Sequence, residues 1–154
     1  MPQYIQSNEI SFTQRFTNHL MLNTSFMDNL GLMHGKMGIA IYFYHLARLT
    51  KNKKHEDFAG ELIDEIYEEI SINPRTNFEN GFAGIGWGIE YLVQNGFIDA
   101  DTDEVLEEFD NLLFNKLIYR TPIEIGLLNG VVGIGVYFLD VSKIQPPTIK
   151  IYQP

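Results

Sequence analysis

The chain has 154 residues and a mass of 17.7 kDa, which suffices for one domain with a substantial hydrophobic core. It contains no cysteine, which excludes disulfides, thiolate nucleophiles and cysteine-ligated metal centres. The formal charge of −9 argues against a nucleic-acid partner, whose phosphates need a cationic surface, and the longest apolar stretch, residues 125–139, is too short for a membrane span.

Apolar residues at a 3.6-residue period predict three amphipathic helices, over residues 8–22, 54–72 and 102–118. The second is the clearest, because its apolar stripe from Ala59 to Ile70 lies opposite a face rich in Glu and Asp. These three helices should be half-exposed. Asp99, Asp101 and Asp103 before the third resemble the start of a calcium loop, but Glu104 stands where the loop needs glycine, which favours Asp101 as the helix N-cap.

Between the amphipathic segments lie runs that are apolar on all sides, which predict buried helices over residues 36–50, 83–95 and 131–142. Short buried strands have a similar composition. The helical register of the first run, which continues to Leu49, favours helices instead. Pro74 and Pro122 fall in connecting loops. We therefore predict one all-helical domain over residues 1–142 and a Pro-rich, non-helical tail over residues 143–154.

Three glycine-rich segments recur along the chain: HGKMGIAIYF at 34–43, NGFAGIGWGI at 80–89 and NGVVGIGVYF at 129–138. The period of 46 to 49 residues indicates a helical repeat in which each unit is an outer helix, a glycine turn and an inner helix. The fold expected from this pattern is a partial α/α barrel, an α/α toroid-type array of three outer/inner hairpins. The order of the glycines, GxxGxG with no preceding strand, disfavours a dinucleotide site.

These segments resemble the repeated glycine motifs of the lanthionine synthetase C-like family, the lantibiotic cyclases, over about residues 30–140. The resemblance implies a toroid of seven helical pairs and a zinc-dependent closure of thioether rings in a precursor peptide. The family's zinc ligands include two cysteines, so the resemblance assigns no metal residue and no cofactor to this chain. The implied role is that of a cytoplasmic peptide-binding or assembly component of peptide modification.

Six residues are candidates for the site. The segment from His34 to Gly38 resembles the family's His-Gly-x-x-Gly motif, in which the histidine transfers protons. His34, Asn80 and Asn129 occupy one repeat position, so they are also candidate N-caps of the inner helices. The remaining candidates for lining a cavity or binding a peptide, or else for the core, are the inner-helix aromatics Tyr42, Trp87 and Tyr137.

Three helical pairs cannot close a seven-pair ring, which leaves an apolar flank on the charge-free helix 131–139. We therefore expect a homodimer, in which two copies form a six-pair ring. Two alternatives stay open at this point. The chain is either half of a zinc cyclase completed by another chain, or a truncated product without a function of its own.

Overall fold

A computed structural model describes residues 11–70, 75–119 and 124–140. These residues form helices without any strand, which confirms the predicted all-α class. The helices are α1 (Phe12–Asn23), the short 3-10 helix η1 (Thr24–Phe26), α2 (Lys36–Thr50), α3 (Lys53–Glu69), α4 (Phe82–Gln94), α5 (Thr102–Val105), α6 (Glu107–Tyr119) and α7 (Val131–Asp140). The predicted start of the first helix at residue 8 and the predicted tail lie outside the described residues.

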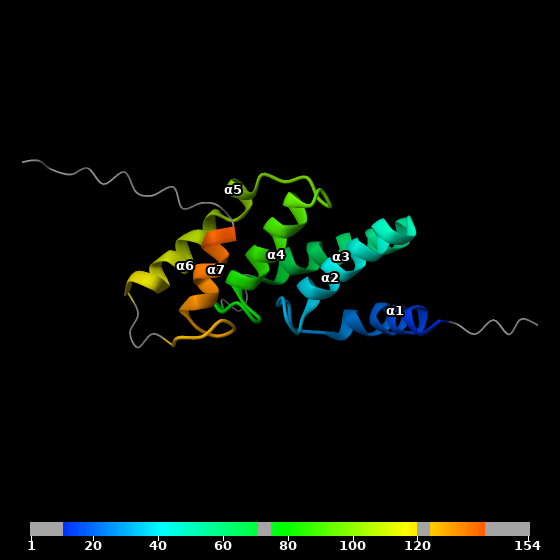
Figure 1. The fold of residues 1–154 in the computed structure, drawn as a ribbon, viewed down its shortest axis with the longest axis horizontal. Coiled ribbons are helices and arrows are strands. Elements are labelled where there is room, and N and C mark those ends of the chain that lie inside the picture. The colour runs from blue at the N-terminus through cyan, green and yellow to red at the C-terminus, as the bar shows by residue number, and fades with distance from the viewer. Residues whose placement is uncertain (1–10, 71–74, 120–123, 141–154) are drawn as a thin grey trace, which may run out of the picture.

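The helices follow one another along an elongated array. Figure 1 shows α1, α2 and α3 at one end, α6 and α7 at the other, and α4 between them. The inner helices α2, α4 and α7 are neighbours in this order, while α3 packs along α2 and α6 packs against α4. Each outer helix thus packs mainly on the inner helix that precedes it, α3 on α2 and α6 on α4, whereas the predicted hairpins pair it with the inner helix that follows; closure into a toroid stays a prediction.

The outer helix α3 behaves as its sequence predicts. Its buried residues, Ala59, Leu62, Ile63 and Ile66, form one stripe at helical spacing. The N-cap is Asn52, whose side chain accepts a hydrogen bond from the backbone N–H of Lys54. On the acidic face, Glu61, Asp64 and Glu68 point to solvent.

The third outer helix differs from the prediction, because it is broken into α5 and α6 at Leu106. Asp101 is the N-cap of α5, as predicted, and its carboxylate accepts from the N–H of Asp103. At Leu106 the backbone leaves helical geometry, with φ −101° and ψ 3°. The Leu106 side chain has no exposed surface, so the break places it in the core.

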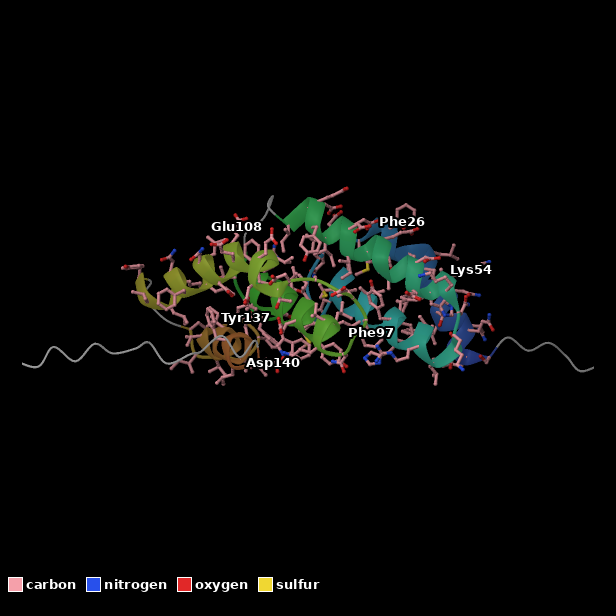
Figure 2. The ribbon with its side chains drawn as sticks, turned by 90° about the horizontal axis from the view of Figure 1, so that it is seen from above. Phe26, Lys54, Phe97, Glu108, Tyr137 and Asp140 are labelled. Atoms are coloured by element: carbon pink, nitrogen blue, oxygen red, sulfur yellow. The ribbon has the colours of Figure 1, made fainter. Side chains whose placement is uncertain are left out.

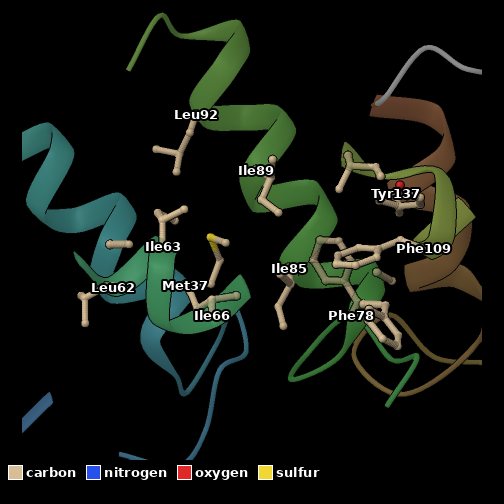
Figure 3. Close-up of a cluster of buried hydrophobic side chains, with 14 of the residues drawn as sticks. Met37, Leu62, Ile63, Ile66, Phe78, Ile85, Ile89, Leu92, Phe109 and Tyr137 are labelled. Atoms are coloured by element: carbon tan, nitrogen blue, oxygen red, sulfur yellow. The ribbon is translucent and has the colours of Figure 1, made fainter. Parts of the chain in front are cut away.

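One hydrophobic core runs from α2 to α7 (Figure 3). It includes Met37 of α2, Ile89 of α4 and Tyr137 of α7. Small residues let the helices approach. A Cβ atom added to Gly88 of α4 would lie 2.6 Å from the sulfur of Met37, and one added to Gly86 would lie 2.6 Å from the Tyr137 ring. Glycine in an inner helix therefore makes room for a large side chain of its neighbour.

One charged residue is buried at the start of α2. The Lys36 side chain is 4% exposed, and its Nζ lies 2.9 Å from Glu65 Oε2 and 3.5 Å from Glu69 Oε1 on α3. Burial lowers the pKa of Lys36, but the hydrogen bond and charge of Glu65, and then those of Glu69, outweigh it and hold the pKa above the ordinary 10.5. This ion pair joins the inner helix α2 to the outer helix α3.

The glycine turns stack on one another through backbone hydrogen bonds. The N–H of Met33 donates to the carbonyl of Glu79 over 2.9 Å, and the N–H of Glu79 donates to the carbonyl of Leu128 over 2.9 Å. Residues 33, 79 and 128 hold the same position in the three repeats. We call residues 29–35, 75–81 and 124–130 the stacked turns.

The predicted capping by His34 and Asn80 is wrong. The N-caps of α2 and α4 are Gly35 and Gly81, and neither helix start has a side-chain cap. Each turn instead folds back so that its own carbonyl accepts from the first helical N–H: Lys36 donates to Asn29 over 2.9 Å, and Phe82 donates to Arg75 over 2.8 Å. A side-chain cap is unnecessary because the backbone already satisfies this donor.

Candidate functional site

The stacked turns bring His34 next to an acidic residue of the following repeat. Its Nε2 lies 3.1 Å from Glu79 Oε1, and the two side chains are 67% and 20% exposed. When Nε2–H donates to the Glu79 carboxylate, Nδ1 is left as a proton acceptor, the arrangement that orients a histidine for general base chemistry. Sequence reasoning found His34 but not its partner, because Glu79 is matched by Met33 and Leu128 in the other repeats.

Asn80 and Asn129 join neighbouring turns through side-chain amides. Asn29 Nδ2 donates to Asn80 Oδ1 over 3.0 Å, and Asn77 Nδ2 donates to Asn129 Oδ1 over 2.8 Å. The Oδ1 of Asn77 also accepts from the backbone N–H of Asn80. Both candidate asparagines therefore sit on the line of stacked turns, and each acquires a partner that the repeat alignment alone does not indicate.

Two surface grooves open beside these asparagines. The larger, about 740 Å³, lies between the second and third turns and α6. Its lining includes Arg75, Asn77, Leu112, Asn115, Lys116 and Asn129. The smaller, about 320 Å³, is lined by Asn29, Glu69 and Asn80 among others, and Arg75 borders both grooves.

The larger groove is lined by two cations, Arg75 and Lys116, and one carboxylate, Glu124, so its lining has a small positive charge although the chain is acidic. Lys116 reaches across from α6 and donates through Nζ to the hydroxyl of Thr76. Arg75 is exposed at the same groove. Two cations beside three side-chain amides offer donors to a carboxylate and to backbone carbonyls. Neither Arg75 nor Lys116 stood out in the sequence, because their spacing follows no motif.

Trp87 lies on α4 and is half-buried. Its ring stacks on Tyr91 at 5.3 Å between centroids and 20° between planes, and meets Phe78 edge-on at 6.0 Å. The Tyr91 hydroxyl forms a 2.8 Å hydrogen bond with His45 Nε2 on α2. This aromatic group is partly accessible, so the prediction that Trp87 binds a peptide stays a prediction.

The two tyrosines have structural partners. Tyr42 shares a 3.0 Å hydrogen bond with the Thr17 hydroxyl, which ties α1 to α2. Tyr137 has no exposed surface, and its hydroxyl donates to Asp110 Oδ1 over 2.5 Å. Burial, followed by the hydrogen bond and charge of Asp110, raises the pKa of Tyr137 well above the ordinary 10.0. Tyr137 is thus a core residue in this structure, and the peptide-binding role predicted for it stays a prediction.

The residues of this chain do not fit a zinc site of the kind the family resemblance implies. There is no cysteine in the sequence. Within the described ranges, no group of three His, Asp or Glu side chains converges on one point. No step of a mechanism is therefore assigned to a metal held by this chain. Within the same ranges, no helix is long and apolar enough to cross a bilayer.

Comparison with known proteins agrees with the repeat pattern. The sequence profile described as "Lanthionine synthetase C-like protein" matches residues 27–152, which is most of the chain and all three stacked turns. No curated protein and no solved structure gives a significant match. The boundary predicted at residue 142 falls inside the matched range and stays a prediction. With three stacked glycine turns, an all-helical array and a profile match of this length, the chain belongs to the lanthionine synthetase C-like family.

Proposed function

We propose that the chain is a peptide-binding component of peptide modification, of the kind that forms thioether rings in lantibiotic-type precursors, and that it carries no zinc site of its own. The groove beside Asn129 supports this proposal most directly. Its volume of about 740 Å³ lies within the range of ordinary ligand sites. Its amide and cationic lining matches the carbonyls and carboxylates of an acidic peptide.

The stacked turns also suit an extended peptide. They place side-chain amides at intervals along one line, from Asn29 to Asn80 and from Asn77 to Asn129. An amide group both donates and accepts, which allows it to pair with successive peptide units. The cations Arg75 and Lys116 then set the preference for acidic side chains.

The experiment is a binding titration with a fluorescein-labelled acidic precursor-type peptide. We expect Arg75→Gln and Lys116→Gln each to weaken binding about tenfold, the size of one lost charge-assisted hydrogen bond. Arg15→Gln on α1 is the matched control, because Arg15 is an exposed cation that does not line the groove. Equal affinity of all three variants and the wild type would contradict the proposal.

A second candidate function, proton transfer, is favoured by the 3.1 Å contact between His34 and Glu79. In this role His34 accepts the proton of a peptide thiol, and Glu79 orients the ring. The alternative of a zinc cyclase completed by another chain would use the same pair.

For this second function we expect His34→Asn to change the free energy of unfolding by less than about 0.5 kcal/mol, since the side chain is largely exposed and caps no helix. Ring closure, assayed by mass spectrometry with the candidate partner protein present, should nevertheless fall. A loss of more than about 1 kcal/mol in urea unfolding would instead show a structural role.

A further inference from the structure

The large exposed apolar side chains belong mostly to the first and third repeats. Of the sixteen among the described residues, nine belong to residues 112–139 and six to residues 12–49. Only Tyr67, on α3, lies between these groups. Figure 2 shows the elongated array from above, with Lys54 near one end and Tyr137 in the other half.

At the α7 end, repeat positions that are buried in the first two repeats become exposed in the third. Met37 and Ala83 are fully buried, whereas Val132 at the same position is 45% exposed. Likewise Tyr44 and Glu90 are 6% and 8% exposed, whereas Leu139 is 72% exposed.

The reason is visible in the first repeat. Met37 packs on Gly88 of the second repeat, and the Tyr44 ring lies 5.6 Å from Phe97 of the second repeat. Each repeat is thus covered by the one that follows. The apolar flank expected on helix 131–139 is therefore exposed: among the described residues, no following repeat covers Val132 or Leu139.

The α2 end has the complementary feature. Ile85 and Ile134 are each 2% exposed, whereas Ile39, their equivalent, is only half-buried. Gly38 is also half-buried, while Gly84 and Gly133 are buried. In the third repeat the equivalent glycine, Gly133, is in contact with the second repeat. A Cβ atom added to Gly133 would lie 2.5 Å from the Cβ of Phe78. Leu49, three turns beyond Gly38 on the same stripe, is 81% exposed.

We call Val132 and Leu139 the trailing face, and Gly38, Ile39 and Leu49 the leading face. Contacts between consecutive repeats join the same two sides of the inner helices: Met37 and Tyr44 of the first repeat meet Gly88 and Phe97 of the second, and Gly86 of the second meets Tyr137 of the third. Charge favours the same pairing of unlike ends. Residues 11–57 contain six Lys or Arg and three Asp or Glu, whereas residues 99–140 contain two Lys or Arg and nine Asp or Glu. Two of the six cations, Lys36 and Lys53, are paired with carboxylates of α3.

We propose that the trailing face of one chain docks on the leading face of a second copy, which continues the series of stacked turns from one molecule into the next. The contact is heterologous, because it joins unlike surfaces. Two copies form a closed ring when the trailing face of each copy binds the leading face of the other. The inference is independent of peptide binding, because it uses neither groove. It specifies which surfaces of the predicted homodimer meet.

The first part of the test is the mass of the full chain in sedimentation at micromolar concentration. We expect twice the chain mass for the wild type and for Tyr67→Glu, an exposed control on α3. A carboxylate placed in the apolar contact should weaken association at least about tenfold in Val132→Glu and in Leu49→Glu. Each variant has one blocked face and one intact face.

The second part is mixing. The intact leading face of Val132→Glu matches the intact trailing face of Leu49→Glu, so an equimolar mixture should recover dimers. This recovery also shows that both variants are folded. A monomeric wild type, a mixture that stays monomeric, or dissociation of Tyr67→Glu to the same degree would each overturn the proposal. The proposal would also be overturned by a monomer whose α7 amides are protected from hydrogen exchange. In that case the chain's own residues 141–154, and not a second copy, would cover the trailing face.

Discussion

Replacing Gly133 by alanine is expected to destabilise the protein by about 3 kcal/mol, the upper range for overpacking a close contact. An added Cβ would lie 2.1 Å from the carbonyl oxygen of Leu127 and 2.5 Å from the Cβ of Phe78. One contact is inside the third turn and the other comes from the second repeat. The turn and the stacking of repeats would both have to shift.

Gly135→Ala is the matched control in the same helix. Nothing lies within 4 Å of the Cβ that this change adds. We expect it to raise the free energy of unfolding by roughly 0.5–1 kcal/mol, because alanine is the better helix former. Urea unfolding followed by circular dichroism measures both changes. Equal effects of the two substitutions would contradict the argument that the turn glycine is required by close approach.

Tyr137→Phe is expected to lower the free energy of unfolding by about 2 kcal/mol, the usual cost of losing a buried hydrogen bond to a charged group. The substitution keeps the ring in the core and removes only the hydroxyl that donates to Asp110. Tyr119→Phe on α6 is the control, since Tyr119 is 78% exposed, and it should change stability little.

The same variant should alter the dependence of stability on pH. Because burial raises the pKa of Tyr137 above the ordinary 10.0, the unfolded chain loses this proton at a lower pH than the folded one. Wild-type stability should therefore fall as the pH rises past 10.0, and the slope should be shallower in Tyr137→Phe. Urea unfolding at several pH values between neutral and alkaline gives both slopes. Identical slopes would show that Tyr137 ionises as freely in the folded state as in the unfolded state.

Much of the secondary structure follows from the sequence. The second helix, predicted over residues 36–50, is α2 (Lys36–Thr50), and the fourth, predicted over 83–95, is α4 (Phe82–Gln94). Both are set by local signals, namely apolar runs after glycine turns. The three repeats and the family also follow from sequence, because the recurrence needs no tertiary information.

Only the tertiary structure decided the partners of the candidate site. His34 meets Glu79, and Asn129 meets Asn77, because backbone hydrogen bonds stack turns that lie one repeat apart. No pattern among neighbouring residues in the sequence indicates which residues of two turns lie side by side. For the same reason the sequence misassigned the helix caps: it showed polar residues before the glycines, but not that the folded turn returns its own carbonyl to the first helical N–H.

The sequence by itself determined the repeat, the residue types at each repeat position and most of the helices, since these depend on periodicity within a few turns of chain, but not the break at Leu106. The tertiary structure determined which of the equivalent positions are covered. Val132 and Met37 occupy the same position, yet one is 45% exposed and the other fully buried. Burial in a stacked array depends on whether a neighbouring repeat follows, and that is a property of the assembled repeats rather than of any residue.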